Sequence, residues 1–521
     1  MEPVRMKDTI LFFYPDANAG NIIPPYAFLY LERAIRDMNL KSVIIDEHFD
    51  QDWKNAVNFH LPRTLAACTS VMLGEQIRKA INFSRHIKEC GDVPVIWGGW
   101  FPTWKPELCL QEDYVDFIIK GQGEIPFSEL IRVLSDQQLS HDDALLSQIS
   151  GLGFKRDGNI FINRIIKFSS FDQYPPVNYD LLEIEKYVDV TKRGGKIFRY
   201  LSSAGCPNKC NFCFIPLGWK GKWFPKSAEA VIEELQYVFD KLPEIDFLSF
   251  EDLDFFVDKP RVLKICRALV NNNIRIPWSA TTHVRNFLNN YSDDDLAQIK
   301  AAGCYSITAG AESGQQDILD TVNKQLSIKE IFDFVRMTDR QAVNTSWSFM
   351  VLFPGKPVED LDITIKMIMK MMYSAKKSKI LYVASSYWPA IKNHYYQMAL
   401  QKGFKEPSDL DSCIRITEEG AAIPWHKPSH LNKLKYFGMF YFRFYYYDKR
   451  FRNLKGVRKL GEHLLFIFFR PFIILRFSLQ ITMFPIEGWL YVSLFKKYLD
   501  HEGFFSPKSN RSVLTQIQNY S

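Results

Sequence analysis

Three closely spaced cysteines are the residues of this chain best suited to chemistry. Cys206, Cys210 and Cys213 lie within eight residues, in the pattern Cys-x3-Cys-x2-Cys. Thiolates are the soft ligands that hold iron–sulfur clusters, and a four-iron cluster normally takes four of them. Three thiolates from one loop would leave one iron open to a small chelating molecule. A zinc site would need a partner pair of Cys or His at finger-like spacing, and none follows in the next fifty residues.

The composition limits the class of protein. At 521 residues the chain exceeds one hydrophobic core, so we expect two to four domains. A net charge of +6 argues against a dedicated nucleic-acid binder. The nine cysteines show no regular pairing, which favours a reducing interior over a disulfide scaffold. The first residues carry no secretion signal, so we expect a cytoplasmic protein.

Strand-like and helix-like segments alternate in the first 150 residues. The expected strands are Thr9–Tyr14, Ser42–Asp46, Thr64–Thr69, Val93–Trp97 and Asp116–Ile119, with helices at Tyr26–Asp37 and Gly74–Glu89. This alternation predicts an α/β domain with a parallel, doubly wound sheet, and such sheets bind ligands beyond the carboxyl ends of their strands.

A second alternation follows the cysteine run and predicts a partial (β/α)6 barrel whose strand ends face one reaction space. Its expected strands are Phe198–Ser202, Phe247–Phe250, Trp278–Ala280 and Ser306–Ala309, with helices at Ala228–Leu242, Asp293–Ala302 and Gln315–Val322. The predicted organisation is a first domain at 1–150, a linker at 151–195, the barrel at 196–400 and a mainly helical extension at 401–521.

The segment around the cysteines, Ser-Ala-Gly-Cys-Pro-Asn-Lys-Cys-Asn-Phe-Cys, resembles the cluster-binding loop of the radical S-adenosylmethionine (SAM) superfamily. The resemblance implies a 4Fe-4S cluster at Cys206, Cys210 and Cys213, whose open iron chelates SAM. An electron, from a donor of flavodoxin or ferredoxin type, would then cleave SAM to a 5′-deoxyadenosyl radical. The aromatic residue before the last cysteine belongs to that family's loop, and here it is Phe212.

Further matches imply where SAM binds. Asp252 fits the family's Phe-x-Asp-Asp-x-Phe strand end, although Leu253 replaces the second acid. Glu312, within residues 310–314, fits the strand whose glutamate contacts SAM, and Arg285 is a candidate partner for the SAM carboxylate. A buried Glu312 would need a cationic or hydroxyl partner, which the ammonium and ribose groups of SAM can supply. The alternative role for Glu312 is an acid at the start of a surface helix.

Four segments of the first domain resemble the cobalamin-binding domain that precedes the radical domain in one large subfamily. The segments are Pro24–Tyr26, Ser70–Gln76, Gly98–Thr103 and Gly121–Glu124, and their glycines fall near expected strand ends, where glycine lets backbone approach a ligand closely. The resemblance implies that cobalamin is contacted by Ser70, Val71, Met72, Leu73, Gly98, Gly99, Trp100, Gly121, Gly123 and Glu124. A Rossmann-like fold without a bound corrin is the alternative. His48 begins a partial Asp-x-His-x-x-Gly cobalt-ligand motif, but Gln51 replaces the glycine, so we expect an exposed loop histidine.

One segment departs from the family pattern. Near residue 385 many relatives have Pro-x-Pro-Gly-Thr, whereas this chain has Ser-Ser-Tyr-Trp-Pro-Ala. The substrate side of the barrel is therefore expected to be remodelled. Tyr387 and Trp388 are candidates to line an apolar pocket, and aromatic core packing is the alternative for each.

The composition changes again after about Trp425. Basic and aromatic residues intermingle at 433–459, and Leu464–Val492 is strongly apolar. The longest uncharged stretch there, Phe477–Ile486, has ten residues, whereas a spanning helix needs about 18–20. We predict peripheral contact of residues 427–500 with the inner face of a membrane. A helical cap over the barrel is the alternative.

The combined resemblance implies a cobalamin-dependent radical SAM methyltransferase. One SAM would methylate cobalamin, and a second would give the radical that removes hydrogen from an unactivated carbon, which then takes the methyl group. A membrane-facing tail favours a small-molecule substrate of lipid-like character, and no nucleic-acid partner is expected. The alternatives are a cobalamin-dependent enzyme that catalyses cyclisation, ring contraction or oxidation and, more remotely, a membrane-associated iron–sulfur redox sensor or an RNA-binding protein.

Overall fold

The computed structural model describes residues 7–16, 22–136, 142–190, 194–418, 423–427, 429–430 and 457–482, with positions 433, 437, 445 and 490. The chain divides into two compact units. Unit 1 contains residues 1–209, 213–278 and 406–421, and unit 2 contains residues 210–212, 279–405 and 422–521.

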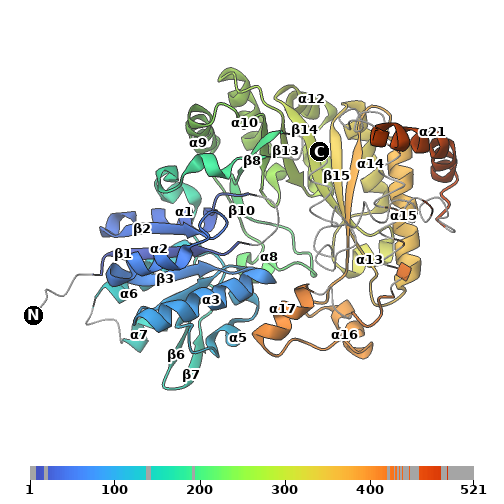
Figure 1. Cartoon of the computed structure of the whole chain (residues 1–521). Coiled ribbons are helices and arrows are strands. Elements are labelled where there is room, and N and C mark those ends of the chain that lie inside the picture. The colour runs from blue at the N-terminus through green and yellow to red at the C-terminus, as the bar shows by residue number, and fades with distance from the viewer. Residues whose placement is uncertain are drawn as a thin grey trace, which may run out of the picture. The chain divides into compact units, whose positions relative to one another are not determined.

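A seven-stranded sheet of order β2-β1-β3-β4-β5-β6-β7 forms the core of unit 1 (Figure 1). Its strands are β1 (Thr9–Tyr14), β2 (Lys41–Asp46), β3 (Thr64–Ser70), β4 (Val95–Gly98), β5 (Phe117–Ile119), β6 (Leu152–Arg156) and β7 (Asn159–Ile162). Strands β1 to β5 are parallel, and the winding reverses between β1 and β3. The predicted doubly wound sheet is therefore confirmed, and ligands bind such sheets beside the reversal.

Burial on both faces explains why the central strands are continuously apolar. Phe12 of β1 stacks on Phe28 on one face, with ring centroids 5.0 Å apart. The next residue, Phe13, stacks on Phe83 on the other face at 4.4 Å. The helices of this domain are α1 (Tyr26–Arg33), α2 (Trp53–His60), α3 (Glu75–Cys90), α4 (Trp100–Trp104), α5 (Pro106–Leu110), α6 (Glu124–Ser135) and α7 (Asp143–Leu146).

Residues 151–195, for which the sequence indicated a connection, contain three strands. β6 and β7 form an antiparallel hairpin that extends the first sheet. Asp157 and Gly158 make its turn with φ of 48° and 76°, the positive values that a two-residue hairpin turn requires. β8 (Asp189–Val190) pairs antiparallel with β9 (Lys196–Tyr200). The Asp-Gly pair was the sequence signal for this hairpin.

A second seven-stranded sheet has the order β16-β15-β14-β13-β12-β9-β8. After β9 its strands are β12 (Phe247–Phe250), β13 (Trp278–Thr282), β14 (Cys304–Glu312), β15 (Asn344–Val351) and β16 (Ile380–Ser386). The strands from β9 to β16 follow one another in chain order and alternate with helices, as in an open (β/α)6 half-barrel, so this prediction is confirmed. Glu312 of β14 lies opposite Phe349 of β15. Val351 of β15 lies opposite Ser386 of β16, and both pairs are at the carboxyl ends of the strands.

The remaining elements are divided between the two units. Unit 1 holds β10 (Ser203–Gly205), β11 (Trp223–Pro225), α8 (Ile215–Trp219), α9 (Ala228–Lys241), α10 (Lys259–Asn271) and α17 (Leu410–Glu418). Unit 2 holds α11 (Val284–Asn290), α12 (Asp293–Ala301), α13 (Gln316–Thr321), α14 (Ile328–Arg340), α15 (Pro357–Ser374), α16 (His394–Gln401) and α21 (Val457–Ser478). Leu410 and Cys413 of α17 are buried in the core cluster that also contains Phe13, so this late segment completes the first domain.

In the described part of the C-terminal extension, α17 and α21 are helical, whereas residues 402–409 and 423–427 form turns and irregular segments. Most of the basic and aromatic segment 433–459 lies outside the described residues. Among the helices that are described, none combines the length and the hydropathy that crossing a bilayer demands.

A buried carboxylate, Asp360 of α15, connects two strand ends in unit 2. It is 1% exposed and accepts hydrogen bonds from Ser313 Oγ at 2.9 Å and from the Leu352 amide at 2.8 Å. Burial raises the pKa of Asp360 from 3.8 to about 6. Because the folded state holds the proton more tightly than the unfolded state, this group stabilises the fold most below pH 4 and progressively less up to pH 6.

We predict that Asp360→Asn lowers the free energy of unfolding at every pH, and that the deficit narrows as the pH rises from 4 to 7. The difference in unfolding free energy between the two proteins should shrink by up to about 3 kcal/mol. The pKa of Asp360 is raised from 3.8 to about 6, and one pKa unit corresponds to about 1.4 kcal/mol. Denaturant unfolding of both proteins across this range measures it. A deficit that stays constant or widens with pH would contradict the assignment.

Candidate functional site

The loops after β3 and β4 are joined at the carboxyl edge of the first sheet. Val71 donates its amide to the Gly98 carbonyl at 2.8 Å, and Phe101 donates to the Val71 carbonyl at 3.0 Å. Gly99 has φ +97°, and a Cβ there would lie 2.8 Å from the Val71 carbonyl oxygen. Ser70 lies opposite Gly98 in the sheet register. Seven of the ten residues predicted to contact cobalamin, 70–73 and 98–100, therefore belong to one rigid pair of loops.

This edge presents an exposed apolar side chain. Met72 is 51% exposed, although apolar side chains are usually covered. Its amide donates to Gln76 Oε1 at 3.1 Å, and Gln76 Nε2 donates to the Pro15 carbonyl at 2.9 Å. The buried glutamine thus ties the ends of β1 and β3 together and holds Met72 at the surface.

The third predicted cobalamin segment, 121–124, is mostly buried. Gln122 Nε2 donates to the Ser169 carbonyl at 2.9 Å. Gly123 packs on α1, where an added Cβ would lie 2.9 Å from Leu31 Cδ2. Glu124 is 4% exposed, and burial raises its pKa. In this segment Gln122, Gly123 and Glu124 therefore pack inside the fold of unit 1.

His48 lies in a polar cluster after β2. Its Nδ1 is 3.4 Å from Asp16 Oδ1, and its side chain is 37% exposed. Lys79 Nζ lies 3.3 Å from both Asp16 and Glu47 carboxylate oxygens. The histidine is thus partly exposed and paired with a carboxylate on the loop after β1.

Two of the three clustered cysteines belong to unit 1, and each receives a hydrogen bond on sulfur. Asn208 Nδ2 donates to Cys206 Sγ at 3.5 Å, and the Ile215 amide donates to Cys213 Sγ at 3.4 Å. Both thiols are partly exposed, and none of the nine cysteines, all at positions that the structure describes, forms a disulfide. Such donors stabilise thiolate charge and are one means of tuning iron–sulfur clusters. Both sites therefore suit cluster ligands.

The remaining cysteine, Cys210, groups with unit 2. It is buried, and the adjacent Asn211 bonds to the end of α13: the Asn211 amide donates to the Val322 carbonyl at 3.1 Å, and its Nδ2 donates to the Thr321 carbonyl at 2.9 Å. Phe212 is half-buried. Within the described residues, no three His, Cys, Asp or Glu side chains converge on a point where they would hold one metal ion. Ligands of a four-iron cluster bind separate irons.

The helix that follows Cys213 lies against the carboxyl edge of the first sheet, within unit 1. At Gly121, φ is +74° and an added Cβ would lie 2.7 Å from the Gly218 carbonyl oxygen of α8. Phe214 contacts Trp104 with ring centroids 5.4 Å apart. Because the two backbones meet without a side chain between them, unit 1 brings the last cysteine of the loop beside the segments predicted to bind cobalamin.

Asp252, predicted to contact SAM, is enclosed by hydroxyl and amide donors. It is 2% exposed. Its carboxylate accepts hydrogen bonds from Ser202 Oγ at 2.7 Å, from the Ser202 amide at 3.1 Å and from Ser203 Oγ. Burial raises its pKa, and the positive charge of Arg261 opposes that rise. In unit 1 Asp252 therefore joins the end of β12 to the strand ends that lead into the cysteine loop.

The two predicted SAM contacts in unit 2 each have a partner within the protein. Glu312 is at φ +61° and pairs with Lys324, whose Nζ lies 2.7 Å from Oε1. Arg285 binds Glu330 through Nε at 2.7 Å and Nη2 at 2.8 Å. Glu330 also caps α14, and Arg285 lowers the pKa of Glu330 to about 2. Glu312 is buried with its counter-ion, whereas Arg285 is 39% exposed.

Sequence reasoning missed the amide side chains that hold the cysteine loop. Asn208 and Asn211 lie inside the loop motif, but their partners are Cys206 and the end of α13. The signal available in the sequence was only that asparagine readily bonds to nearby backbone in turns.

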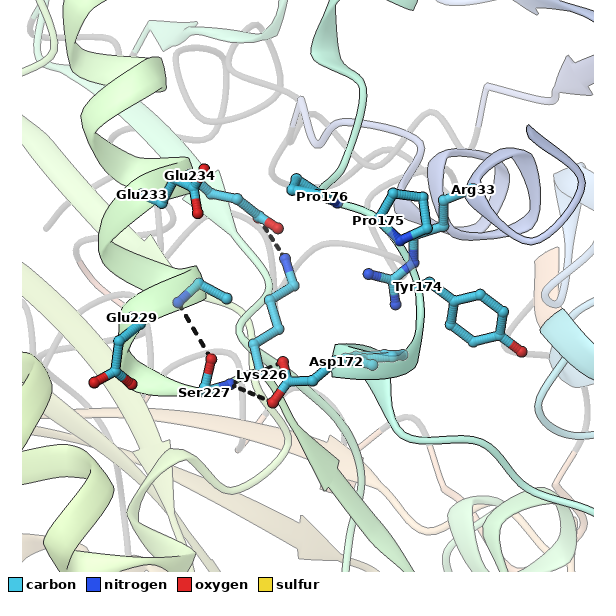
Figure 2. A pocket seen from close by; sticks show the side chains of 12 residues that line it. Arg33, Asp172, Tyr174, Pro175, Pro176, Lys226, Ser227, Glu229, Glu233 and Glu234 are labelled. Atoms are coloured by element: carbon cyan, nitrogen blue, oxygen red, sulfur yellow. Dashed lines mark hydrogen bonds and ion pairs between the residues drawn. The ribbon is translucent and has the colours of Figure 1, made fainter. Parts of the chain in front are cut away.

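A cavity of about 300 Å³ lies elsewhere in unit 1, and none of the predicted cofactor residues lines it. Figure 2 shows Lys226 and Glu234 paired on one side, with Arg33 on the other. Arg33 lies over the rings of Phe171 and Tyr174, at 4.8 and 5.3 Å from the ring centroids. The cavity is thus bordered by an internal ion pair and a stacked guanidinium that join α1, the 171–176 segment and α9.

Comparison with known proteins agrees with this geometry. Residues 200–368 match the family model of the radical SAM superfamily. An uncharacterized methyltransferase of Pyrococcus horikoshii is 27% identical over 68% of this chain and 74% of its own length. Anaerobic magnesium-protoporphyrin IX monomethyl ester cyclase of Rubrivivax gelatinosus is 22% identical over 69% of this chain and 65% of its own. The structure of the cobalamin-dependent SAM radical enzyme OxsB with aqua-cobalamin bound has a TM-score of 0.65 at 14% identity, covering 98% of this chain and 79% of that one.

These findings define the class of protein. The chain carries a radical SAM domain at residues 200–368 and is an enzyme, as the cysteine loop predicted. Its fold is similar to that of OxsB, which agrees with the predicted α/β fold class.

We predict that Gly121→Ala destabilises the protein more than Gly158→Ala does. Both glycines have similar φ, +74° and +76°, so both variants suffer the strain of left-handed backbone. Only at Gly121 would the new methyl group collide with α8, while Gly158 has nothing within 4 Å. The extra loss should be about 1–3 kcal/mol in denaturant unfolding. Equal losses would show that α8 does not rest on this glycine.

Proposed function

We propose that this protein is a cobalamin-dependent radical SAM methyltransferase that acts on an unactivated carbon of an apolar substrate. The observation that carries the proposal is the backbone contact between α8, just after Cys213, and Gly121 at the edge of the first sheet. Methyl transfer from cobalt to a substrate radical requires the two cofactors to face one space. The relative named as a methyltransferase supports the same conclusion.

Each cofactor has residues of this chain to hold it. Cys206, Cys210 and Cys213 would bind a 4Fe-4S cluster, reduced by a flavodoxin- or ferredoxin-type donor, and the loops at 70–73 and 98–100 would contact cobalamin. When bound, cluster and SAM supply a 5′-deoxyadenosyl radical, and cobalamin supplies the methyl group. Lys324 binds one oxygen of Glu312, which leaves the other to accept a hydrogen bond from SAM.

The apolar substrate is proposed from side chains at the strand ends of unit 2. Phe353, Tyr387 and Tyr395 form an aromatic cluster after β15 and β16, with ring centroids 4.6 to 5.9 Å apart. Tyr387 lies in the segment that departs from the family pattern. All three side chains are buried, so they would lie behind a binding space as an apolar layer, and an apolar surrounding favours a substrate with little charge.

A second candidate is a cobalamin-dependent cyclase. The relative that is a magnesium-protoporphyrin IX monomethyl ester cyclase aligns over a similar share of the chain. Such a reaction would use the same cluster and SAM sites without methyl transfer, so the fate of the SAM methyl group separates the two functions.

We predict that the full-length protein, reconstituted without oxygen and supplied with methyl-deuterated SAM, forms 5′-deoxyadenosine and labelled methylcobalamin. Cys206→Ala and Cys213→Ala should abolish deoxyadenosine formation, because the cluster loses a ligand. Cys90→Ala, an exposed thiol on α3, is the control and should retain it. Mass spectrometry follows both products. Deoxyadenosine without any labelled methyl acceptor would favour the cyclase, and zinc in the loop would exclude both.

We also propose that α21 rests on a membrane surface. Side chains at helical spacing on it are both large and exposed: Phe468 is 63% exposed, Phe472 51% and Leu475 55%, and Leu479, just after the helix, is 60% exposed. Arg470 is exposed beside them, whereas Arg476 is 8% exposed and donates to the Ile481 carbonyl. Apolar surface of this extent with a neighbouring cation fits an anionic lipid interface.

We predict that the triple variant Phe468→Ser, Phe472→Ser, Leu475→Ser partitions onto anionic lipid vesicles at least ten-fold less than the wild type. Each half-exposed side chain should contribute about 1 kcal/mol on burial in lipid. Phe59→Ser is the control, because Phe59 is 80% exposed but lies on α2. Vesicle flotation measures the partition. Equal flotation of the triple variant and the wild type would exclude α21 as the contact.

A further inference from the structure

We infer that Asn393 is a positioning residue for the cluster-binding loop, and that it ties the second cysteine of the loop to the substrate-side end of β16. The link lies wholly within unit 2. Its role toward a cluster rests on the proposed function, but its mechanical role can be tested without any cofactor.

The loop is held at Asn211, between Cys210 and Phe212. Besides its two hydrogen bonds to the end of α13, Asn211 accepts a third at its backbone carbonyl, from Asn393 Nδ2 at 3.2 Å. Cys210 beside it is 8% exposed. The Asn393 bond connects Asn211, the residue next to this cysteine, to a segment 182 residues away in sequence.

The Asn393 amide has only one orientation that satisfies its neighbours. Its Oδ1 accepts the Tyr396 amide at 2.9 Å, which caps α16, and the Tyr387 hydroxyl at 3.2 Å. An amide oxygen accepts and an amide nitrogen donates, so two donors on the oxygen side direct Nδ2 toward the Asn211 carbonyl. The donor to the loop is therefore oriented by a helix cap and by a tyrosine.

Tyr387 extends the link to the buried aromatic cluster that follows β16. It is 1% exposed, and its ring stacks on Phe353 with centroids 4.6 Å apart. Tyr387 is also the residue that this chain has where many relatives have a Pro-Gly-Thr turn. The segment that is remodelled on the substrate side is thus the one that reaches the cluster loop through Asn393.

The variant Asn393→Asp isolates this link. A carboxylate at this position still accepts hydrogen bonds from the Tyr396 amide and the Tyr387 hydroxyl, so the cap of α16 is kept. The N–H group that donates to the Asn211 carbonyl is lost. In the apo protein we expect iodoacetamide to alkylate Cys210 about five-fold faster, which is the effect of one hydrogen bond on a local opening equilibrium. Cys206, held by Asn208, should keep its rate, and peptide mass spectrometry resolves the two. Tyr387→Phe, which leaves the donor but frees its orientation, should give a smaller rise.

Asn178→Asp is the matched control. Asn178 also caps a short helical turn, by accepting the Asp180 amide at 3.1 Å, but it lies far from the loop in sequence, in unit 1. This variant should leave both alkylation rates unchanged. An unchanged Cys210 rate in Asn393→Asp would overturn the inference, and so would an equal rise at Cys206 and Cys210, which indicates general loosening.

A second readout uses the reconstituted cluster. The reduction potential should become more negative in Asn393→Asp, because an added negative charge near the loop disfavours the reduced cluster. Potentiometric titration followed by electron paramagnetic resonance measures it, and an unchanged potential would remove the link to the cluster. If wild-type protein assembles no cluster, the proposed function fails, whereas the alkylation result still decides whether Asn393 holds the loop.

Discussion

The close approach of two backbones, at Gly121 and Gly218, is the constraint on which the site in unit 1 depends. A methyl group on Gly121 would collide with the carbonyl oxygen of Gly218, so the first sheet and α8 meet only because neither residue has a side chain. Since α8 begins two residues after Cys213, this contact sets the position of the end of the cysteine loop. The arrangement places two of the three clustered cysteines and the predicted cobalamin segments within one compact unit.

Two buried carboxylates at strand ends of the second sheet, Asp252 and Glu312, each have partners that offset the loss of water. Asp252 is surrounded by serine donors, and Glu312 is paired with Lys324. The exposed Arg285 is engaged by a capping glutamate. Both buried acids therefore have structural partners already, and a contact to SAM would use the atoms that remain.

Local patterns predicted the elements well where burial is two-sided. β1 was expected at Thr9–Tyr14 and is found there, because an apolar strand between glycine- and proline-containing turns has few alternatives. The hairpin of β6 and β7 was missed, since its strands at a sheet edge are short and partly polar. The segment 70–73 was placed correctly at a strand end, but the burial of Glu124 was not foreseen, because neighbouring residues in a turn can face opposite directions.

The sequence by itself determined the chemistry offered at the cysteine loop, since three thiols within eight residues stay close whatever the rest of the chain does. It also determined the two alternations of strands and helices, because hydrophobic periodicity is a local property. Only the tertiary structure decided the partners: Lys324 for Glu312, Glu330 for Arg285 and Asn393 for the loop at Asn211. These pairings join residues 12 to 182 positions apart, and spacing along a chain carries no information about which distant polar groups burial will bring together.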